Sequence, residues 1–217
     1  IIRPDEPRLR WRDDLDQISV EDLQVAAQAR HGALQPLQRQ RPADDVALPT
    51  RLERQIAFLE AHPSVGLLGS AARAVDEYNR EAAVSRPPEE DRAIRRALIR
   101  RNPFVHSSVM LLRTIAVQAG GYDPSFAVAQ DYDLWLRLAP LTAMANLAEP
   151  LVIRRLVAGR VTAARDDERM RAEARARWRA VCRRAYPTWG AVFTLRPLLA
   201  LAIPRPLRAS LRLALGR

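Results

Sequence analysis

The sequence is poor in several residue types, and each scarcity limits what the chain can be. A single cysteine, Cys182, excludes an internal disulfide and any metal site built from several cysteines, and it favours a reducing, cytoplasmic location. There is no lysine, so all 35 basic side chains are arginine, a compositional bias from which we infer no function. The 48% hydrophobic content among 217 residues is typical of one globular domain with an appendage.

A secretory signal and long hydrophobic runs are also missing. The chain opens with IIRPDEPRLRWRDD, which has neither an initiator methionine nor the apolar core of a signal peptide, so we expect a fragment of a longer protein. In the C-terminal tail, no uncharged run reaches the roughly 18 apolar residues of a membrane-spanning helix.

Negative charge is scarce near the C-terminus. Residues 1–150 hold 19 Arg against 21 Asp and Glu, a balance of −2, whereas residues 151–217 hold 16 Arg against 4 acids, a balance of +12. From Arg175 onward there are ten arginines and no carboxylate, interleaved with aromatic residues and leucines. This profile is typical of a segment that lies on an anionic surface. Nucleic acid is not the expected partner, because the sequence contains no recognisable nucleic-acid module.

Four helices are expected in the body of the chain. Thr50 and Glu53 fit a capping box at the start of a helix over residues 51–61, whose inner face would consist of Leu52, Ile56 and Leu59. Acids precede arginines in PPEEDRAIRRALIRRNP, which predicts a helix of about three turns. The segment TIAVQAGGYD predicts a short helix that ends at its two glycines, and QDYDLWLRLAP predicts another that ends near its proline.

Strand patterns alternate with these helices. The run VGLLGSAARAV, residues 65–75, suits a buried strand, and further strands are expected in FVHSSVMLLR, TAMANL and PLVIRRL. Helices that alternate with buried strands indicate an α/β layer fold containing a sheet.

The tail allows two interpretations. The segment ARDDERMRAEARARWRAVCRRAYP predicts one long charged helix, and the remainder predicts two shorter segments broken at Pro197 and Pro204. The tail either lies on an anionic membrane surface, with aromatic and leucine side chains at the level of the headgroups, or packs on the domain as an amphipathic helix. Helical periodicity alone does not separate the two.

Four stretches in the body carry a resemblance to a known family. Within residues 43–155 they read, in order, ADDVALPTRLERQIAFLEAHPSVGLLGS, NPFVHSSVMLLR, AGGYDPSF and AQDYDLWLRL. Together they resemble the second half of a family-two glycosyltransferase with the GT-A fold. The resemblance implies a partial GT-A, Rossmann-like sheet flanked by helices over residues 43–162. An N-terminal remnant, residues 1–42, would precede it, and a basic helical extension, residues 163–217, would follow.

The resemblance also implies a reaction and a place for it. Such enzymes transfer a sugar from a nucleotide-diphosphate donor to a glycan or lipid-linked acceptor, with inversion at the anomeric carbon. We therefore expect a role in cell-envelope polysaccharide biosynthesis, in the cytoplasm and peripheral to the inner face of the membrane. A noncatalytic scaffold derived from such a transferase, held at the membrane surface, is the alternative.

The first acidic pair matches a metal-binding position of the family. Members hold a divalent cation, Mn²⁺ or Mg²⁺, with an Asp-x-Asp motif whose final carboxylates match Asp44 and Asp45. A hard cation takes oxygen ligands and neutralises the charge that builds on the departing nucleotide. The first aspartate of the motif falls on Pro42, which offers no ligand. In the alternative, both carboxylates only solvate a loop and favour the dipole of the next helix.

The second acidic pair matches the catalytic position. In the resembling enzymes an acidic pair at a helix start supplies the general base, and here the pair is Gln130 and Asp131, with Asp131 at the base position. A carboxylate there would take the proton from the acceptor hydroxyl as it attacks the anomeric carbon. In the alternative, Asp131 is an ordinary acid in the first turn of a helix.

Further matched positions are predicted to bind substrate: His106, Gly120, Gly121, Tyr122, Asp133 and Arg137. Each also has a structural interpretation. A histidine on a strand end can simply be hydrogen-bonded, two glycines can cap a helix, and a helix arginine is usually solvated.

The nucleotide-binding half of the family has no counterpart in residues 1–42. That half normally brings two strands whose carboxyl ends hold the nucleobase and ribose, and residues 1–42 contain no buried strand pattern. We therefore expect this chain alone to bind a nucleotide sugar weakly or not at all.

Overall fold

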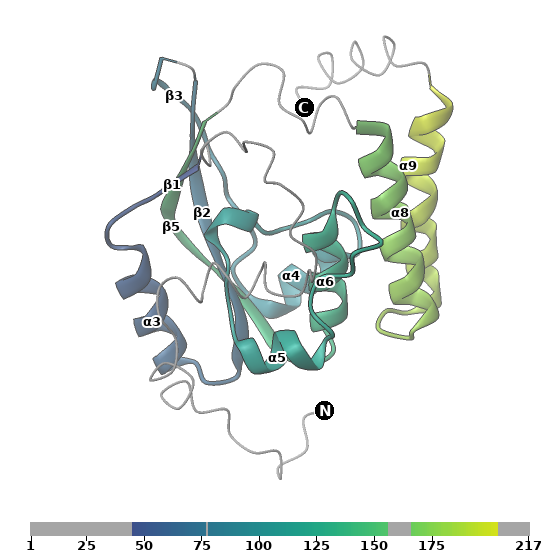
Figure 1. Cartoon of the computed structure of the whole chain (residues 1–217), viewed down its shortest axis with the longest axis horizontal. Helices are drawn as coiled ribbons and strands as arrows, with labels where there is room; N and C mark the ends of the chain where they lie inside the picture. The colour runs from purple at the N-terminus through teal and green to yellow at the C-terminus, as the bar shows by residue number, and fades with distance from the viewer. Residues whose placement is uncertain (1–44, 77, 156–165, 204–217) are drawn as a thin grey trace, which may run out of the picture.

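The computed structural model describes residues 45–76, 78–155 and 166–203, which form a mixed α/β fold with a sheet flanked by helices (Figure 1). This agrees with the fold class expected from the sequence. The expected remnant at residues 1–42 lies outside the described residues. The elements, in chain order, are β1 Asp45–Ala47, α3 Arg51–Ala61, β2 Val65–Val75, β3 Glu81–Val84, α4 Asp91–Leu98, η1 His106–Ser108, β4 Met110–Leu111, α5 Arg113–Gln118, α6 Gln130–Leu138, β5 Ala143–Arg155, α8 Asp166–Cys182, η2 Thr188–Ala191 and α9 Val192–Ala202.

The sheet has the order β1-β5-β2-β3, with β4 also paired to β2. Strands β2 and β5 run parallel, and the other pairs are antiparallel. The first eight residues of β2 are buried, as expected for a central strand covered on both faces. Beyond that point β2 continues into an exposed hairpin with β3, which projects from the top of the molecule in Figure 1.

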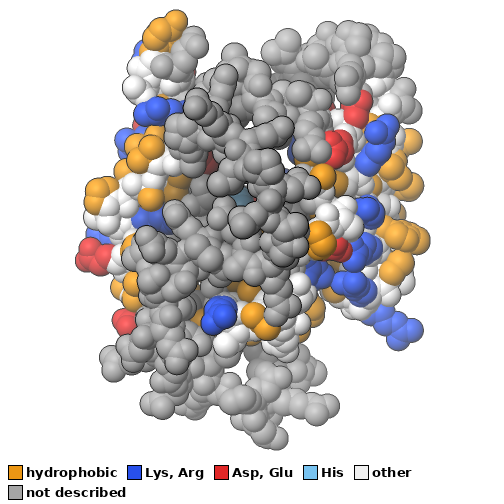
Figure 2. Space-filling model, viewed as in Figure 1, with side chains coloured by type: hydrophobic (Ala, Val, Ile, Leu, Met, Phe, Trp, Pro, Cys, Tyr) orange, Lys and Arg blue, Asp and Glu red, His pale blue; other side chains and the backbone are white. Residues whose placement is uncertain are grey.

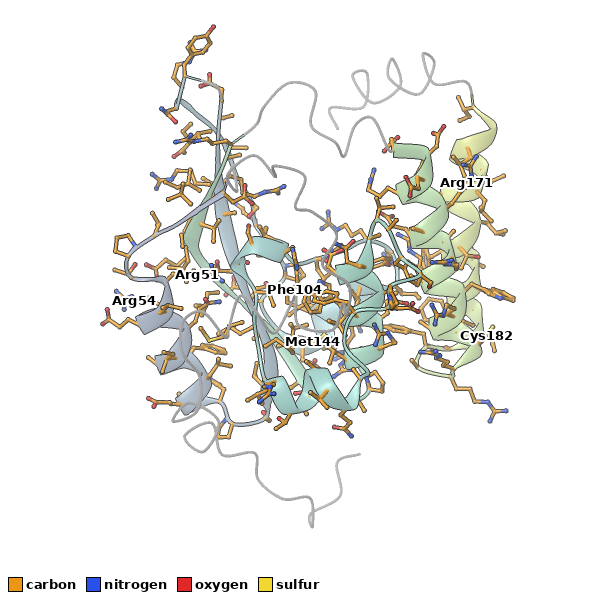
Figure 3. All side chains as sticks on the ribbon, in the orientation of Figure 1. Arg51, Arg54, Phe104, Met144, Arg171 and Cys182 are labelled. Carbon is orange, nitrogen blue, oxygen red and sulfur yellow. The ribbon has the colours of Figure 1, made fainter. Side chains whose placement is uncertain are left out.

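The hydrophobic core lies between the sheet and α4, α5 and α6. Phe104 and Met144 occupy its centre in Figure 3, and the Phe104 ring meets Trp135 of α6 edge-on at 5.9 Å between centroids. Ile94 and Leu98 bury the inner face of α4, which is two turns long and therefore shorter than expected. These contacts fix α6, the predicted catalytic helix, against the sheet.

Helix α3 has the predicted bounds but not the predicted cap. Thr50 adopts helical backbone angles, φ −79° and ψ −5°, and its side chain makes no capping hydrogen bond, so the capping box is wrong. The predicted inner face is also partly wrong, because Leu52 is exposed and Gln55 is buried in its place. Gln55 is satisfied there: its Nε2 donates to Ser108 O at 2.8 Å, and Arg51 donates to its Oε1 at 3.0 Å.

The strand predicted in FVHSSVMLLR forms only at Met110–Leu111, and residues 106–108 turn as a 3₁₀ helix instead. The cause is Ser108. Its hydroxyl accepts a hydrogen bond from Ser70 N at 3.0 Å and donates one to Val105 O at 2.8 Å. A serine side chain thereby takes the place of a ladder partner along β2, as short polar side chains commonly do. The two strands predicted in TAMANL and PLVIRRL form one continuous strand, β5, with pairing irregularities near Ala71.

The predicted helix of the tail exists, and it packs on the domain. Helix α8 buries one face against α6, with Met170, Ala174, Ala176, Arg177, Ala180 and Val181 inside. Helix α9 lies alongside α8 at the right edge of the fold in Figure 1.

The predicted break at Pro197 is wrong, since α9 continues through that residue, where packing against α8 outweighs one lost backbone hydrogen bond. Pro204 lies outside the described residues. Across residues 45–76, 78–155 and 166–203, no helix is long and apolar enough to span a membrane.

Candidate functional site

Two residues of the 3₁₀ turn η1 lead from the first predicted acidic site toward the second. Asp45 begins β1, opposite Arg154 of β5, whose guanidinium lies 3.8 Å from the carboxylate. Ser107, in the middle of η1, donates a hydrogen bond of 2.7 Å to Asp45 Oδ2. Ser107 therefore fixes the carboxylate of Asp45, the member of the first acidic pair that lies within the described residues.

The neighbouring residue of the same turn leads to the second pair. His106 Nε2 and Tyr122 Oη share a hydrogen bond of 3.0 Å, and their rings meet edge-on at 6.2 Å between centroids. Burial and, second, the negative charge of Asp131 together raise the pKa of Tyr122 to about 12. Hydrogen bonds and the turn itself join Asp45, Ser107, His106 and Tyr122, and Asp131 interacts electrostatically with Tyr122. We call these five residues the η1 cluster.

Asp131 is positioned by a strained turn and by an amide. The preceding Ala129 has a left-handed backbone, φ 58°, which is uncommon for a residue other than glycine and turns the chain sharply into α6. Asn102 Nδ2 donates to Asp131 Oδ2 at 2.9 Å, while Asn102 Oδ1 accepts from Phe104 N at 3.1 Å. The amide is held at both ends, so it fixes the orientation of the carboxylate.

Asp133 and Arg137 make contacts of a different kind. Asp133 is 2% exposed, and Arg137 Nε donates to its Oδ2 at 2.8 Å. Arg137 also donates to Ala119 O and, at 2.7 Å, to Gly121 O. These bonds hold the end of α5 against α6 and leave the Asp133 carboxylate inside the protein. Substrate binding by this pair stays a prediction.

The two predicted glycines cap α5. Gly120 and Gly121 have φ of 83° and 64°, in the region that favours glycine. Gly121 N donates to Ala116 O and Gly120 N donates to Val117 O, the two hydrogen bonds of a Schellman motif. This cap places Tyr122, the next residue, beside His106.

The described residues do not by themselves form a metal site. Among residues 45–76, 78–155 and 166–203 there is no group of three or more His, Cys, Asp or Glu side chains that could hold a metal ion. Asp45 is the described carboxylate at the predicted position, and Ser107 and Arg154 already contact it. Asp44 lies outside the described residues. Mg²⁺ needs about six oxygen ligands, more than Asp45 supplies. Binding of Mn²⁺ or Mg²⁺ therefore stays a prediction.

Two cavities occur elsewhere in the described part of the fold. One, of about 280 Å³, lies between α5, α6 and α8 and includes Arg137, Arg179, Arg183 and Arg184 in its lining. The other, of about 410 Å³, lies at the hairpin end of the sheet between Val46, Arg73 and Ile153. Neither is lined by His106 or Asp131, so the η1 cluster is defined by its contacts rather than by either cavity.

Sequence reasoning missed two residues of this site: Ser107 of the η1 cluster, and Asn102, which holds Asp131. Asn102 precedes a proline, a dipeptide that marks a turn, and this signal could have identified it. Ser107 had no such signal, because its partner Asp45 is 62 positions away in the chain.

No family model matches the chain. Comparison with curated proteins finds the amylovoran biosynthesis glycosyltransferase AmsE of Erwinia amylovora, 36% identical over 110 residues, or 50% of this chain and 41% of the relative. An uncharacterised glycosyltransferase of Haemophilus influenzae is 33% identical over 132 residues, 60% of this chain and 48% of the relative. The O-antigen biosynthesis glycosyltransferase WbnJ of Escherichia coli is 30% identical over 113 residues, 51% of this chain and 43% of the relative. The chain spans less than half the length of these relatives, and over about half of its own length it resembles glycosyltransferases, as its sequence predicts.

Proposed function

We propose that this chain belongs to the acceptor side of a family-two, GT-A glycosyltransferase. In this proposal a sugar passes from a nucleotide-diphosphate donor to a glycan or lipid-linked acceptor in the cytoplasm, with inversion. The observation that carries it is the η1 cluster, in which Asp45 accepts a hydrogen bond from η1 and Asp131 interacts electrostatically with Tyr122, the hydrogen-bond partner of His106. The similarity to glycosyltransferases of polysaccharide biosynthesis supports the same reaction class.

Asp131 is the proposed general base. Its Oδ2 accepts from Asn102, whereas no donor within the described part of the chain bonds its Oδ1, which is available to an acceptor hydroxyl. As that hydroxyl oxygen attacks the anomeric carbon, its proton passes to the carboxylate, and the bond from the sugar to the nucleotide diphosphate breaks on the opposite face. Attack from the face opposite the leaving group inverts the configuration.

Tyr122 and His106 lie side by side within the η1 cluster, and His106 is exposed. Tyr122 keeps its proton throughout the physiological range, because its pKa is raised to about 12. Its hydroxyl and the exposed imidazole of His106 can therefore exchange hydrogen bonds with sugar hydroxyls without any change in charge. We propose that they orient the acceptor.

The test is sugar transfer by the chain and by Asp131→Asn, each supplied in trans with the nucleotide-binding half of a similar glycosyltransferase. The substitution keeps the size of the side chain and removes the proton acceptor. Radiolabelled UDP-, GDP- and dTDP-sugars at millimolar concentration are offered with a bacterial cell-envelope extract. Loss of a general base lowers the rate about 10²- to 10⁴-fold. The matched control is Glu149→Gln on the exposed part of β5, which should transfer at the wild-type rate. Equal rates for wild type and Asp131→Asn would remove Asp131 from the chemistry.

A noncatalytic scaffold is the second candidate. It is favoured by Pro42 and Gln130, which stand where the resembling enzymes carry acids. If the wild-type chain transfers no sugar from any donor even with the nucleotide-binding half supplied in trans, and Asp131→Asn leaves the cellular phenotype unchanged, the scaffold is the better account.

A further inference from the structure

The surface of α8 and α9 is unusually apolar for the outside of this protein. Twelve large hydrophobic side chains are exposed in the described residues, and half of them lie between residues 178 and 199. The other six are scattered singly over the sheet and the other helices and turns. The six that gather here are between 46% and 68% exposed: Trp178, Trp189, Val192, Leu195, Leu198 and Leu199. A concentration of this kind marks an interaction surface.

Three of these six side chains lie on the outer face of α9. Val192, Leu195 and Leu199 follow the i, i+3, i+7 pattern, so they share one side of α9. Thr194 and Pro197 are buried on the other side. Helix α9 therefore has an apolar face that nothing in the described residues covers, in addition to the face that it packs against the domain.

Positive charge accompanies this apolar face. Of the arginines in residues 174–203, Arg175, Arg183 and Arg184 are exposed, whereas Arg177 is buried beside Glu173 and Arg179 pairs with Asp123. Arg171, Arg175 and Trp178 lie on one exposed side of α8, together with Cys182. Figure 2 shows arginine atoms and hydrophobic atoms next to each other along the edge formed by α8 and α9, and Figure 3 labels Arg171 and Cys182 on that edge.

We propose that this face, the outer side of α8 and α9, docks on the surface of an anionic lipid bilayer. Arginines beside leucine and tryptophan are the composition of helices that lie in the headgroup region. An eleven-residue helix is about 16 Å long and cannot cross a hydrocarbon core of about 30 Å, so α9 lies along the surface rather than through it. A second copy of the chain is a poorer occupant, because it would bring the exposed arginines of two copies together, among them Arg175, Arg183 and Arg184.

The docking face is rigidly connected to the η1 cluster. Arg179 of α8 donates to Asp123 at 2.8 Å and lies 3.9 Å from Asp133 of α6. Arg175 donates to Ser125 O at 2.7 Å and stacks on Phe126 at 3.9 Å. These contacts tie α8 to the loop between Tyr122 and α6, so a docked α8–α9 pair would hold Asp131 in a fixed orientation to the bilayer. Docking itself does not depend on transferase activity.

The test uses the single cysteine as a reporter. A polarity-sensitive dye on Cys182, which is exposed, is monitored while vesicles of phosphatidylcholine, with or without 30% phosphatidylglycerol, are added. We expect a blue shift and sedimentation with the anionic vesicles. Binding to neutral vesicles should be at least about tenfold weaker, because each arginine near an anionic surface contributes about fivefold. Raising the salt from about 0.1 to 0.5 M should weaken binding to the anionic vesicles, since it shortens the Debye length.

Matched variants separate this face from the rest of the surface. The pair Leu195→Gln and Leu199→Gln should weaken anionic-vesicle binding about tenfold or more, because two exposed leucines can no longer be buried. Val117→Gln, equally exposed on α5, should bind as the wild type does, and so should Asp131→Asn. Circular dichroism checks that each variant is folded.

Three results would overturn the proposal. These are equal binding to neutral and anionic vesicles, wild-type binding by the two-leucine variant, and a concentration-dependent dimer in ultracentrifugation that the two-leucine variant abolishes. The last would identify a second copy as the occupant. A chain that docks normally but transfers no sugar, even with the nucleotide-binding half supplied in trans, would refute the proposed function and leave the docking face intact.

Discussion

Arg177 of α8 donates a hydrogen bond of 2.8 Å to the hydroxyl of Tyr132, the residue that follows Asp131 in α6. The Tyr132 hydroxyl in turn donates to Leu98 O at the end of α4. Arg177 is 3% exposed and also donates to Glu173 at 3.0 Å and to Arg100 O at 3.1 Å. One guanidinium therefore joins the tail helix to two helices of the domain. Helix α8 is part of the core rather than an appendage.

Replacing this arginine should destabilise the whole fold. Arg177→Ala would remove three hydrogen bonds and leave the half-buried Glu173 with only Arg169 as a partner. We expect a loss of about 2–4 kcal/mol in the free energy of unfolding, because breaking a buried ion pair leaves polar groups without partners. Urea denaturation followed by circular dichroism measures it. Arg171→Ala, exposed on the same helix, should change stability by less than about 0.5 kcal/mol. Equal midpoints for the two variants would contradict the buried role.

The electrostatic effect of Asp131 on Tyr122 can be tested without any substrate. The pKa of Tyr122 is raised to about 12, first by burial and second by the Asp131 charge. Asp131→Asn should lower the pKa of Tyr122, because the neighbouring negative charge no longer opposes ionisation. Spectrophotometric titration of tyrosinate detects the change, and Tyr122→Phe assigns the signal. The control Glu149→Gln should leave the titration unchanged. If the pKa of Tyr122 is the same in Asp131→Asn as in the wild type, Asp131 does not interact with Tyr122.

The same shift has a consequence for stability at high pH. Tyr122 holds its proton more tightly in the folded state than in the unfolded state, where the pKa is about 10. Its contribution to stability is therefore complete below pH 10 and is lost as the pH rises from 10 to about 12. Tyr186 behaves in the same way, because burial raises its pKa to about 12. Tyr122→Phe should reduce the loss of unfolding free energy across this interval, as measured by urea denaturation at each pH. A loss as steep as that of the wild type would contradict this assignment.

Asn102 is predicted to position the proposed base. Asn102→Ala should lower the rate of transfer about tenfold with little change in the acceptor KM, because the carboxylate is then free to rotate. Asn102→Asp should place two carboxyl groups within hydrogen-bonding distance, so that one of them holds a proton at higher pH. The acid limb of the pH–rate profile should then move to higher pH. A wild-type rate in Asn102→Ala, together with an unshifted pH–rate profile in Asn102→Asp, would show that Asn102 does not position the base.

The sequence predicted the elements whose signals are local. The bounds of α3, β2 and α6 followed from periodicity, and the end of α5 followed from two glycines that adopt positive φ. Failures occurred where a distant partner decides the outcome. Ser108 replaces strand pairing because it meets Ser70, and Gln55 is buried because Ser108 O accepts from it.

The candidate site divides in the same way. Asp131, His106 and Tyr122 carried family signals, whereas Asn102 and Ser107 are recognised only by their distant partners Asp131 and Asp45. Packing of α8 on α6 also depends on contacts between segments about 45 residues apart, such as Arg177 with Tyr132. Helical periodicity in a single sequence does not contain that information.

Nucleotide binding provides the final prediction. The β1 edge contributes Asp45, already in contact with Ser107 and Arg154, and residues 1–42 lack the strand pattern of a nucleotide-binding half. We therefore expect no measurable heat when uridine diphosphate and Mn²⁺ are titrated into the chain at micromolar concentration. Binding that appears only when an upstream segment is added in trans would support the division into donor and acceptor halves. Micromolar affinity for the chain alone, lost in Asp45→Asn and retained in Glu149→Gln, would instead establish that this segment contains its own diphosphate site.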